Sequence, residues 1–165
     1  MTHIYFGVDI SKAWIDIFNP LTGRHRRIAM QKGELDRFAR TLPDHALVVF
    51  EATGVYPWPL IEALDRHKRL YNAVNPREAK AFRTASGQLA KTDRIDARML
   101  SRMGEAFVLE PDDPIPPQQR KIQALMGLRD DLVKSRTGYE CRLQQTFDTY
   151  IRREIKSLIA VLIRR

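Results

Sequence analysis

Three short β-prone runs open this chain before any helical pattern appears, and this order limits the folds that the chain can adopt. The runs span residues 4–10, 14–18 and 25–30, and turn-forming pairs such as Asn19-Pro20 lie between the last two. Consecutive strands joined by short loops favour antiparallel pairing, because a parallel pair needs a long crossover connection. We therefore expect an antiparallel meander at the N-terminus.

Helical and strand patterns alternate after the meander. Helices are predicted over 34–42 and 58–67, strands over 46–50 and 70–74, and a helical pattern over 76–107 is interrupted near Ser86-Gly87. The run 46–50 is entirely apolar, as in a strand buried on both faces. The resulting order, β-β-β-α-β-α-β-α, is that of the ribonuclease H-like fold. We predict this α/β fold, with a mixed five-stranded sheet, helices on both sides, and the first and fourth strands adjacent at the centre.

A proline-rich segment at 111–117 divides the chain, since it cannot continue a helix. We predict a domain over 1–110, a linker over 111–117 and a helical segment over 118–165. In the last segment apolar residues recur at spacings of three and four, which indicates one long amphipathic helix. Its exposed stripe requires a partner, so we expect an antiparallel or dimeric coiled coil and a homo-oligomer.

The charge of the chain points to a polyanionic partner. Its net charge is +8, and residues 118–165 contain 11 basic and 5 acidic side chains. Such an excess predicts binding to nucleic acid. The single cysteine, Cys141, forms no internal disulfide, and no signal sequence or bilayer-length apolar run is present. We expect a soluble cytoplasmic protein with no membrane partner.

Two carboxylates three residues apart, Asp93 and Asp96, lie in the segment Lys-Thr-Asp-Arg-Ile-Asp-Ala at 91–97. On a helix this spacing places both on one face. A hard divalent cation such as Mg²⁺ is a common way to hold two carboxylates together. An acidic pair at a helix start is also favoured by the helix dipole alone. The motif by itself therefore favours a stabilised helix end over a metal site.

Two more carboxylates occupy positions that fit the predicted sheet. Asp9 lies in the first strand and Glu51 directly follows the fourth. If these strands are neighbours, both side chains lie near one point, and four carboxylates can hold two metal ions about 3.5–4 Å apart for in-line phosphoryl transfer. Ordinary structural roles also explain these acids. Asp9 can cap a turn with Ser11, Glu51 can be the exposed end of an edge strand, and Asp96 can form an ion pair with Arg94 or Arg98. Their coincidence favours the metal site.

Four segments occur in an order that resembles a known family: Gly-Val-Asp-Ile-Ser-Lys at 7–12, Glu-Ala-Thr-Gly-Val-Tyr at 51–56, Val-Asn-Pro-Arg at 74–77, and the 91–97 segment. They resemble the N-terminal RuvC-like domain of the DEDD transposases of bacterial insertion sequences, the IS110 family. Pilin-gene invertases and RNA-guided bridge recombinases also belong to it. The resemblance covers residues 4–107, and the segment from 118 onward matches the family's coiled coil.

The resemblance implies a catalytic site and its cofactors. Four residues match the family's metal-binding acids: Asp9, Glu51, Asp93 and Asp96. The implied cofactor is Mg²⁺, two ions, with Mn²⁺ as a substitute. The implied activity is DNA strand cleavage and exchange in transposition, guided in many members by a structured RNA. Family members carry a nucleophilic serine in a further C-terminal domain, whereas this sequence stops at Arg165. We therefore expect a fragment that does not complete recombination alone.

Basic residues around the acids and in the tail are candidate nucleic-acid contacts. They are Lys12, Arg77, Lys80, Arg83, Lys91, Arg94, Arg120, Lys121 and Arg129. A solvated helix face explains the same residues without a ligand. Two other functions remain open at this point: a non-catalytic RNA- or DNA-binding and oligomerisation module, and a stand-alone RuvC-like structure-specific nuclease.

Overall fold

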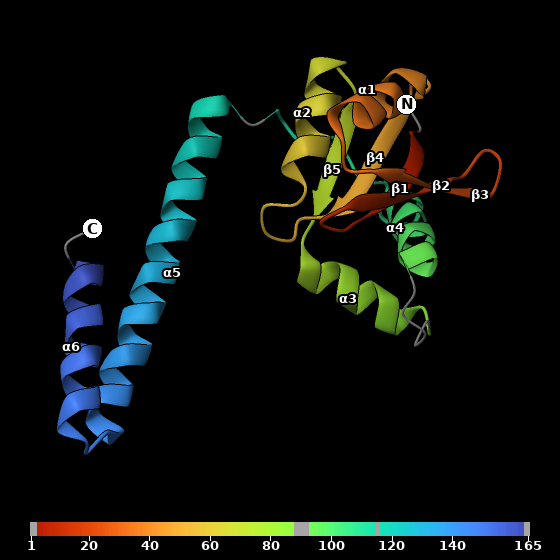
Figure 1. The fold of residues 1–165 in the computed structure, drawn as a ribbon. Helices are drawn as coiled ribbons and strands as arrows, with labels where there is room; N and C mark the ends of the chain where they lie inside the picture. The colour runs from red at the N-terminus through yellow and green to blue at the C-terminus, as the bar shows by residue number, and fades with distance from the viewer. Residues whose placement is uncertain (1–2, 88–92, 115, 164–165) are drawn as a thin grey trace. The chain divides into compact units, whose positions relative to one another are not determined.

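The computed structural model describes residues 3–87, 93–114 and 116–163 (Figure 1). The chain divides into two compact units, residues 1–114 and 115–165. In the residues described, the first unit contains the sheet and four helices, and the second contains two helices. Each unit is described by itself below.

A five-stranded mixed sheet forms the centre of the first unit. Its strands, in sequence order, are β1 (Ile4–Ile10), β2 (Trp14–Asn19), β3 (Arg24–Ala29), β4 (Ala46–Glu51) and β5 (Leu70–Val74). Their order in the sheet is β3-β2-β1-β4-β5. The first three strands pair antiparallel, whereas β4 runs parallel to both β1 and β5. The predicted meander and the adjacency of the first and fourth strands are thus confirmed.

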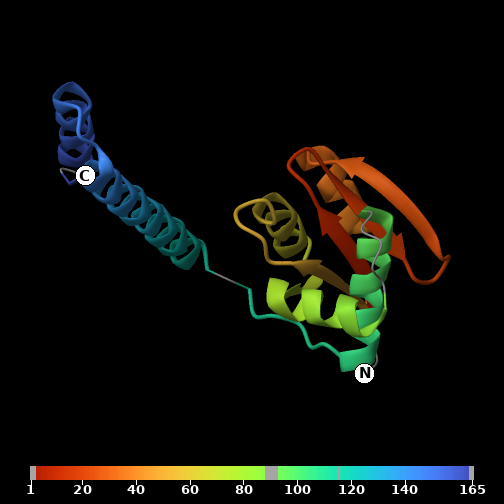
Figure 2. The same ribbon diagram turned by 90° about the horizontal axis from the view of Figure 1, so that it is seen from below.

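Helices cover both faces of this sheet, as predicted for a ribonuclease H-like fold. On one face, α1 (Lys32–Thr41) and α2 (Trp58–Arg66) enclose a core that includes Phe6, Val8 and Ile15. On the other face, α3 (Pro76–Ala85) and α4 (Asp93–Phe107) pack over Tyr5 and the alternate residues of β4. Figure 2 shows α4 lying along the sheet with α3 beside it. The even and odd positions of β1 therefore belong to different layers.

Helix α4 approaches β1 more closely than side chains would allow. A Cβ atom on Gly7 would lie 1.8 Å from the carbonyl oxygen of Ala97, and one on Gly104 would lie 2.5 Å from the ring of Tyr5. The hydroxyl of Ser101, between them, donates a hydrogen bond of 2.6 Å to the carbonyl oxygen of Tyr5. Ala97, Ser101 and Gly104 form one stripe of small residues on α4, and this stripe fixes the position of the helix along β1.

The second unit is a helical hairpin and not the single helix predicted over 118–165. Helices α5 (Pro117–Gln145) and α6 (Thr149–Ile163) pack side by side, and the chain reverses direction between them (Figures 1 and 2). The carboxylate of Asp148 accepts a hydrogen bond from the backbone N–H of Ile151 and so caps α6. Arg152 donates hydrogen bonds to the carbonyl oxygens of Leu143 and Thr146 at the end of α5. The prediction of one continuous helix is wrong because these caps stabilise a break at 146–148.

The hairpin leaves much of the apolar surface of α5 exposed. In the first half of α5, the exposed apolar side chains are Ile122, Leu125, Met126 and Leu128. Among the described residues of this unit, Ile155 is the buried apolar side chain. No helix in the described part of the chain has the length and apolarity required to cross a membrane.

Candidate metal-binding cleft

The alternation of side chains along two neighbouring parallel strands places Asp9 and Glu51 on the same face of the sheet. In β1, Tyr5, Gly7 and Asp9 alternate with the buried Phe6 and Val8 on the opposite face. In β4, Leu47 and Val49 share their face with Glu51. The register pairs Val8 with Phe50, so the next position in each strand carries a carboxylate. This face is the one that α3 and α4 cover.

Helix α4 brings a third carboxylate to this edge of the sheet. Asp96 precedes Ala97, whose carbonyl oxygen lies over Gly7 in the strand that carries Asp9. The side chain of Asp96 is only 6% exposed, and the guanidinium of Arg83 lies 3.0 Å from its Oδ1 atom. Because Arg83 comes from α3, this ion pair joins the two helices next to the sheet.

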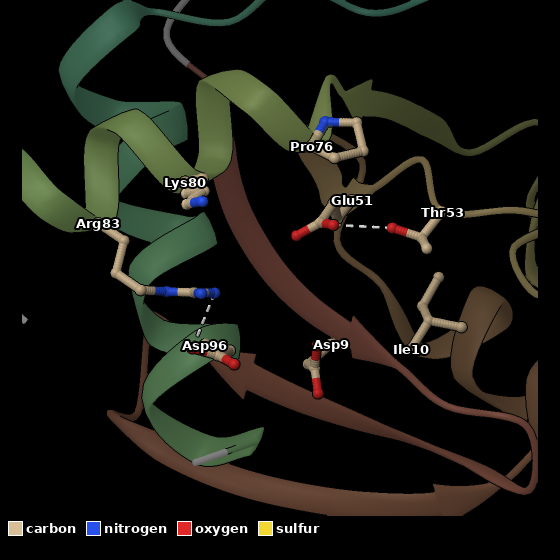
Figure 3. Close-up of a pocket in the computed structure, with 8 residues that line it drawn as sticks. All are labelled: Asp9, Ile10, Glu51, Thr53, Pro76, Lys80, Arg83 and Asp96. Atoms are coloured by element: carbon tan, nitrogen blue, oxygen red, sulfur yellow. Dashed lines mark hydrogen bonds and ion pairs between the residues drawn. The ribbon is translucent and has the colours of Figure 1, made fainter. Parts of the chain in front are cut away.

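The three carboxylates line one cavity of about 460 Å³, which we call the acidic cleft (Figure 3). Its lining residues are Asp9, Ile10, Glu51, Thr53, Pro76, Lys80, Arg83 and Asp96. They come from β1, from the end of β4 and the loop that follows it, and from α3 and α4. The fold thus gathers into one cleft three acids that lie up to 87 positions apart in the sequence.

Hydrogen bonds orient two parts of the acidic cleft, the side chain of Glu51 and the start of α3. The hydroxyl of Thr53 donates a hydrogen bond of 2.7 Å to Oε1 of Glu51. At the start of α3, the side chain of Asn75 accepts a hydrogen bond of 2.9 Å from the backbone N–H of Arg77 and so caps the helix that follows β5. Lys80 and Arg83, three residues apart on α3, then face the cleft together (Figure 3).

The donor set of the acidic cleft suits a hard divalent cation in chemistry, since carboxylate oxygens are the ligands that Mg²⁺ prefers. In the described residues, however, no three acidic, histidine or cysteine side chains are placed so that they could hold one ion together. A guanidinium in contact with Asp96 supplies positive charge at this place. The residues therefore fit a metal by type, and ligation requires their side chains to move closer together.

The fourth predicted acid is placed only in part. Asp93 is the first residue of α4, and its side chain lies outside the described part of the structure. The same holds for the side chains of Arg94 and Arg120, and for Lys91 as a whole.

The remaining basic candidates are scattered. Lys80 and Arg83 line the acidic cleft. Lys12 is exposed in the loop after β1, and Arg77 is exposed on the first turn of α3. Lys121 and Arg129 are exposed on α5 in the second unit. The structure therefore brings two of the predicted cationic residues to the predicted acids.

The sequence interpretation missed two contacts of this cleft. It did not single out Thr53, although a hydroxyl two residues after a carboxylate commonly bonds to it locally. It named Arg94 or Arg98 as ion-pair partners of Asp96 and did not name Arg83 of α3, which the structure places 3.0 Å from the carboxylate. No spacing in the sequence predicts the Arg83–Asp96 pair, because the pair depends on how α3 and α4 pack against each other.

Comparison with known proteins yields one family. The family model for the DEDD transposases of IS110-type elements, described as a transposase, matches residues 6–152. The matched range contains all the residues that line the acidic cleft and continues into α6. No curated protein matches the chain.

Proposed function

The chain belongs to the IS110 family of DEDD transposases, and from this we propose that the acidic cleft is the site of divalent-metal-dependent cleavage and exchange of DNA strands. The observation that carries the proposal is the convergence of Asp9, Glu51 and Asp96 on one cleft whose wall also carries two cations, Lys80 and Arg83. A site for phosphoryl transfer needs both features, oxygen ligands for metal ions and positive groups for the phosphate.

We assign Asp9, Glu51 and Asp96 as metal ligands, with Asp93 as the fourth from the start of α4. Bound there, two Mg²⁺ ions, or Mn²⁺ in their place, would activate the attacking oxygen and stabilise the leaving oxygen of an in-line displacement. Thr53 holds the carboxylate of Glu51 in one orientation through its 2.7 Å hydrogen bond. This contact reduces the rotational freedom that Glu51 must lose when it binds a cation.

Lys80 and Arg83 are assigned to the DNA phosphate. Both lie on the wall of the cleft. Arg83 is bound to Asp96 in this structure. The planar fork of its guanidinium is well suited to donate to phosphate oxygens, and a cation held by Asp96 would free it for that contact.

The proposal extends to two partners. Exposed basic residues along the second unit, among them Lys121 and Arg129, suit sequence-independent contact with nucleic-acid backbone, including a structured guide RNA. The uncovered apolar residues in the first half of α5, such as Ile122 and Leu125, suit a second copy of the chain. Co-purifying RNA and the mass of the assembly in solution test these two points separately.

A second candidate function is a non-catalytic nucleic-acid-binding module. The observation that favours it is that no three ligand-type side chains of the described residues are placed to hold one ion. Magnesium binding distinguishes the two functions, because only the catalytic proposal requires it.

The test is a Mg²⁺ titration of thermal stability, with NaCl of equal ionic strength as the reference. For a dissociation constant of about 1 mM, about 10 mM Mg²⁺ stabilises the folded state by about 1.4 kcal/mol and raises the unfolding midpoint by about 5 °C. Asp9→Asn is expected to lose this rise.

The matched control is Glu62→Gln, which removes a carboxylate from the exposed face of α2. It is expected to keep the full magnesium effect. If Mg²⁺ stabilises the parent and Asp9→Asn equally, the acidic cleft is not the metal site, and an absent effect in the parent favours the binding module.

A further inference from the structure

A second cavity, of about 730 Å³, lies on the opposite face of the sheet, and we call it the hairpin cleft. It is formed by the β2–β3 hairpin, α1 and β1. Apolar side chains of Phe6, Ile17 and Phe38 belong to its lining, and Asn19, Arg24 and Arg26 supply polar groups. The other lining residues are Leu21, Thr22, His25, Thr41, Leu42 and Pro43, so apolar and polar residues contribute equally to the cleft.

The register of the hairpin explains why the two arginines face this cleft. Strand β3 pairs Arg24 with Asn19 and Arg26 with Ile17, so these residues share the face that α1 covers. Their neighbours His25 and Arg27 alternate to the other face of the strand, although His25 also contributes to the lining of the cleft. There Arg27 forms a salt bridge of 2.7 Å with Asp16.

The segment that forms β3 and α1 carries an excess of positive charge. Residues 24–40 contain six basic and two acidic side chains, and one of the six, Arg27, is neutralised by Asp16 on the other face of the sheet. Both acids, Glu34 and Asp36, have closer partners than the two arginines of the cleft. Glu34 lies 2.6 Å from Arg37. Asp36 is bound by Arg66 and His67 of α2.

The two arginines of the cleft are therefore poorly neutralised. Arg26 lies 4.0 Å from Glu34, the limit for an ion pair, and its side chain is 60% exposed. Within the described residues, Arg24 has no carboxylate at ion-pair distance. Two exposed guanidinium groups at the mouth of an apolar cleft are complementary to a polymer that combines phosphates with flat apolar groups.

We propose that the hairpin cleft binds a single-stranded segment of the DNA substrate. This inference rests on the proposed function in one respect, that the substrate is DNA. Arg24 and Arg26 contact two backbone phosphates, and an unpaired base enters the cleft against Phe38. A single strand fits because its bases can turn out of the stack, whereas the faces of a base in a duplex are covered by its neighbours. This surface lies across the sheet from the acidic cleft.

Binding of fluorescently labelled oligonucleotides to the full chain in EDTA tests the proposal, because EDTA removes any contribution of metal at the acidic cleft. The variant is Arg24→Gln/Arg26→Gln. Its affinity for a thymidine strand is expected to fall about tenfold, and the slope of log affinity against log salt to decrease in magnitude by about 1.4, for two lost phosphate contacts. The matched control is Lys68→Gln/Arg102→Gln, which removes two exposed positive charges elsewhere in the first unit and should change affinity less than about twofold.

An abasic strand of the same length tests entry of the base, since it carries the same phosphates. The parent is expected to bind it at least about fivefold more weakly than the thymidine strand. Thr41→Trp, at an exposed position that lines the cleft, should fill the cleft and abolish this difference.

Several results would overturn the proposal. They are an unchanged salt slope in Arg24→Gln/Arg26→Gln, an equal loss in the control pair, a loss for an RNA strand without a loss for DNA, and an unchanged preference for bases in Thr41→Trp. Glu62→Gln, which lies in neither cleft, should bind the strand in EDTA as the parent does, and this assay does not depend on the result of the magnesium titration. Failure of the acidic cleft in the magnesium titration and failure of the hairpin cleft are thus separate outcomes.

Discussion

Gly7 of β1 and Ala97 of α4 are in backbone-to-backbone contact: a Cβ atom on Gly7 would lie 1.8 Å from the carbonyl oxygen of Ala97. No flexible side chain is available to move out of the way. The neighbours of these two residues are the acids of the cleft, since Asp9 follows Gly7 by two positions and Asp96 precedes Ala97. The distance between strand and helix therefore sets the distance between the two carboxylates.

Gly7→Ala is expected to destabilise the first unit by about 3 kcal/mol, at the upper end of overpacking, because α4 must shift away from the sheet. Gly33→Ala, in α1, is the matched control. No atom lies within 4 Å of its added Cβ, and it should stabilise the protein by about 0.5 kcal/mol. Urea denaturation of both variants measures the difference. Equal stabilities of the two variants would contradict the close packing of α4.

Arg83→Gln removes the 3.0 Å ion pair with Asp96. Without metal, we expect a loss of about 2 kcal/mol, less than for a fully buried pair because the side chain of Arg83 is 22% exposed. The rise in unfolding temperature with Mg²⁺ should be larger than in the parent, since a cation then approaches Asp96 without displacing a guanidinium. Calorimetric titration with Mg²⁺ gives the affinity directly.

Arg69→Gln is the control for this variant, since the side chain of Arg69 is also 22% exposed and its partner, Asp44, is 92% exposed. It should leave the effect of magnesium unchanged. An identical magnesium affinity in Arg83→Gln and the parent would show that Arg83 does not compete with the cation.

Asp36 gives the stability of the first unit a defined dependence on pH. Partial burial acts to raise the pKa of its carboxyl group, but the hydrogen bond and charge of Arg66, followed by those of His67, outweigh it and lower the pKa below 3.8. A carboxyl whose pKa is lowered in the folded state stabilises that state fully above its ordinary pKa and loses the contribution as the pH falls through the lowered value. The contribution is therefore present at pH 5 and declines below about pH 3.8.

Asp36→Asn should accordingly lose less stability than the parent when the pH is lowered from about 5 to about 3. Denaturation midpoints measured across this range provide the comparison. Asp44→Asn, at a carboxylate that is 92% exposed, should follow the parent. Parallel curves for Asp36→Asn and the parent would rule out a role for Asp36 in acid stability.

Asp148→Ala removes the N-terminal cap of α6, where the carboxylate accepts the N–H of Ile151 at 2.9 Å. The expected cost is about 1 kcal/mol, localised to the hairpin of the second unit. Amide hydrogen exchange should be faster in the first turn of α6 and unchanged in the sheet. Asp131→Ala, in the exposed middle of α5, should leave exchange in α6 as it is, and faster exchange in both variants would contradict a specific cap.

The antiparallel pairing of the first three strands could be predicted because their connections are short. The adjacency of the first and fourth strands was predicted from the ribonuclease H-like order of the elements. The convergence of Asp9 and Glu51 follows from that order, since both lie at the same ends of adjacent parallel strands. The ion pair of Asp96 with Arg83 did not follow, because it depends on the packing of α3 against α4, which no sequence spacing reveals.

The break between α5 and α6 was missed for a different reason. Phe147 continues the apolar spacing of the preceding residues, so the pattern predicts that the helix runs on. In the structure its side chain is 92% exposed at the reversal of the chain. The capping capacity of Asp148 is the sequence signal for the break, and the prediction, which was made from periodicity, did not use it.

Strand β1 contributes Phe6 to the hairpin cleft and Asp9 to the acidic cleft, on opposite faces of one sheet. Substitutions can alter either cavity independently. Insertion or deletion of one residue between Phe6 and Asp9 would move the side chains on one side of the change to the opposite face of the sheet, so that a carboxylate would be buried at the position of an aromatic ring. Both cavities therefore depend on the same alternation of side chains along β1. Evolution can tune each of them by point mutation, whereas length variation in this strand would destroy at least one.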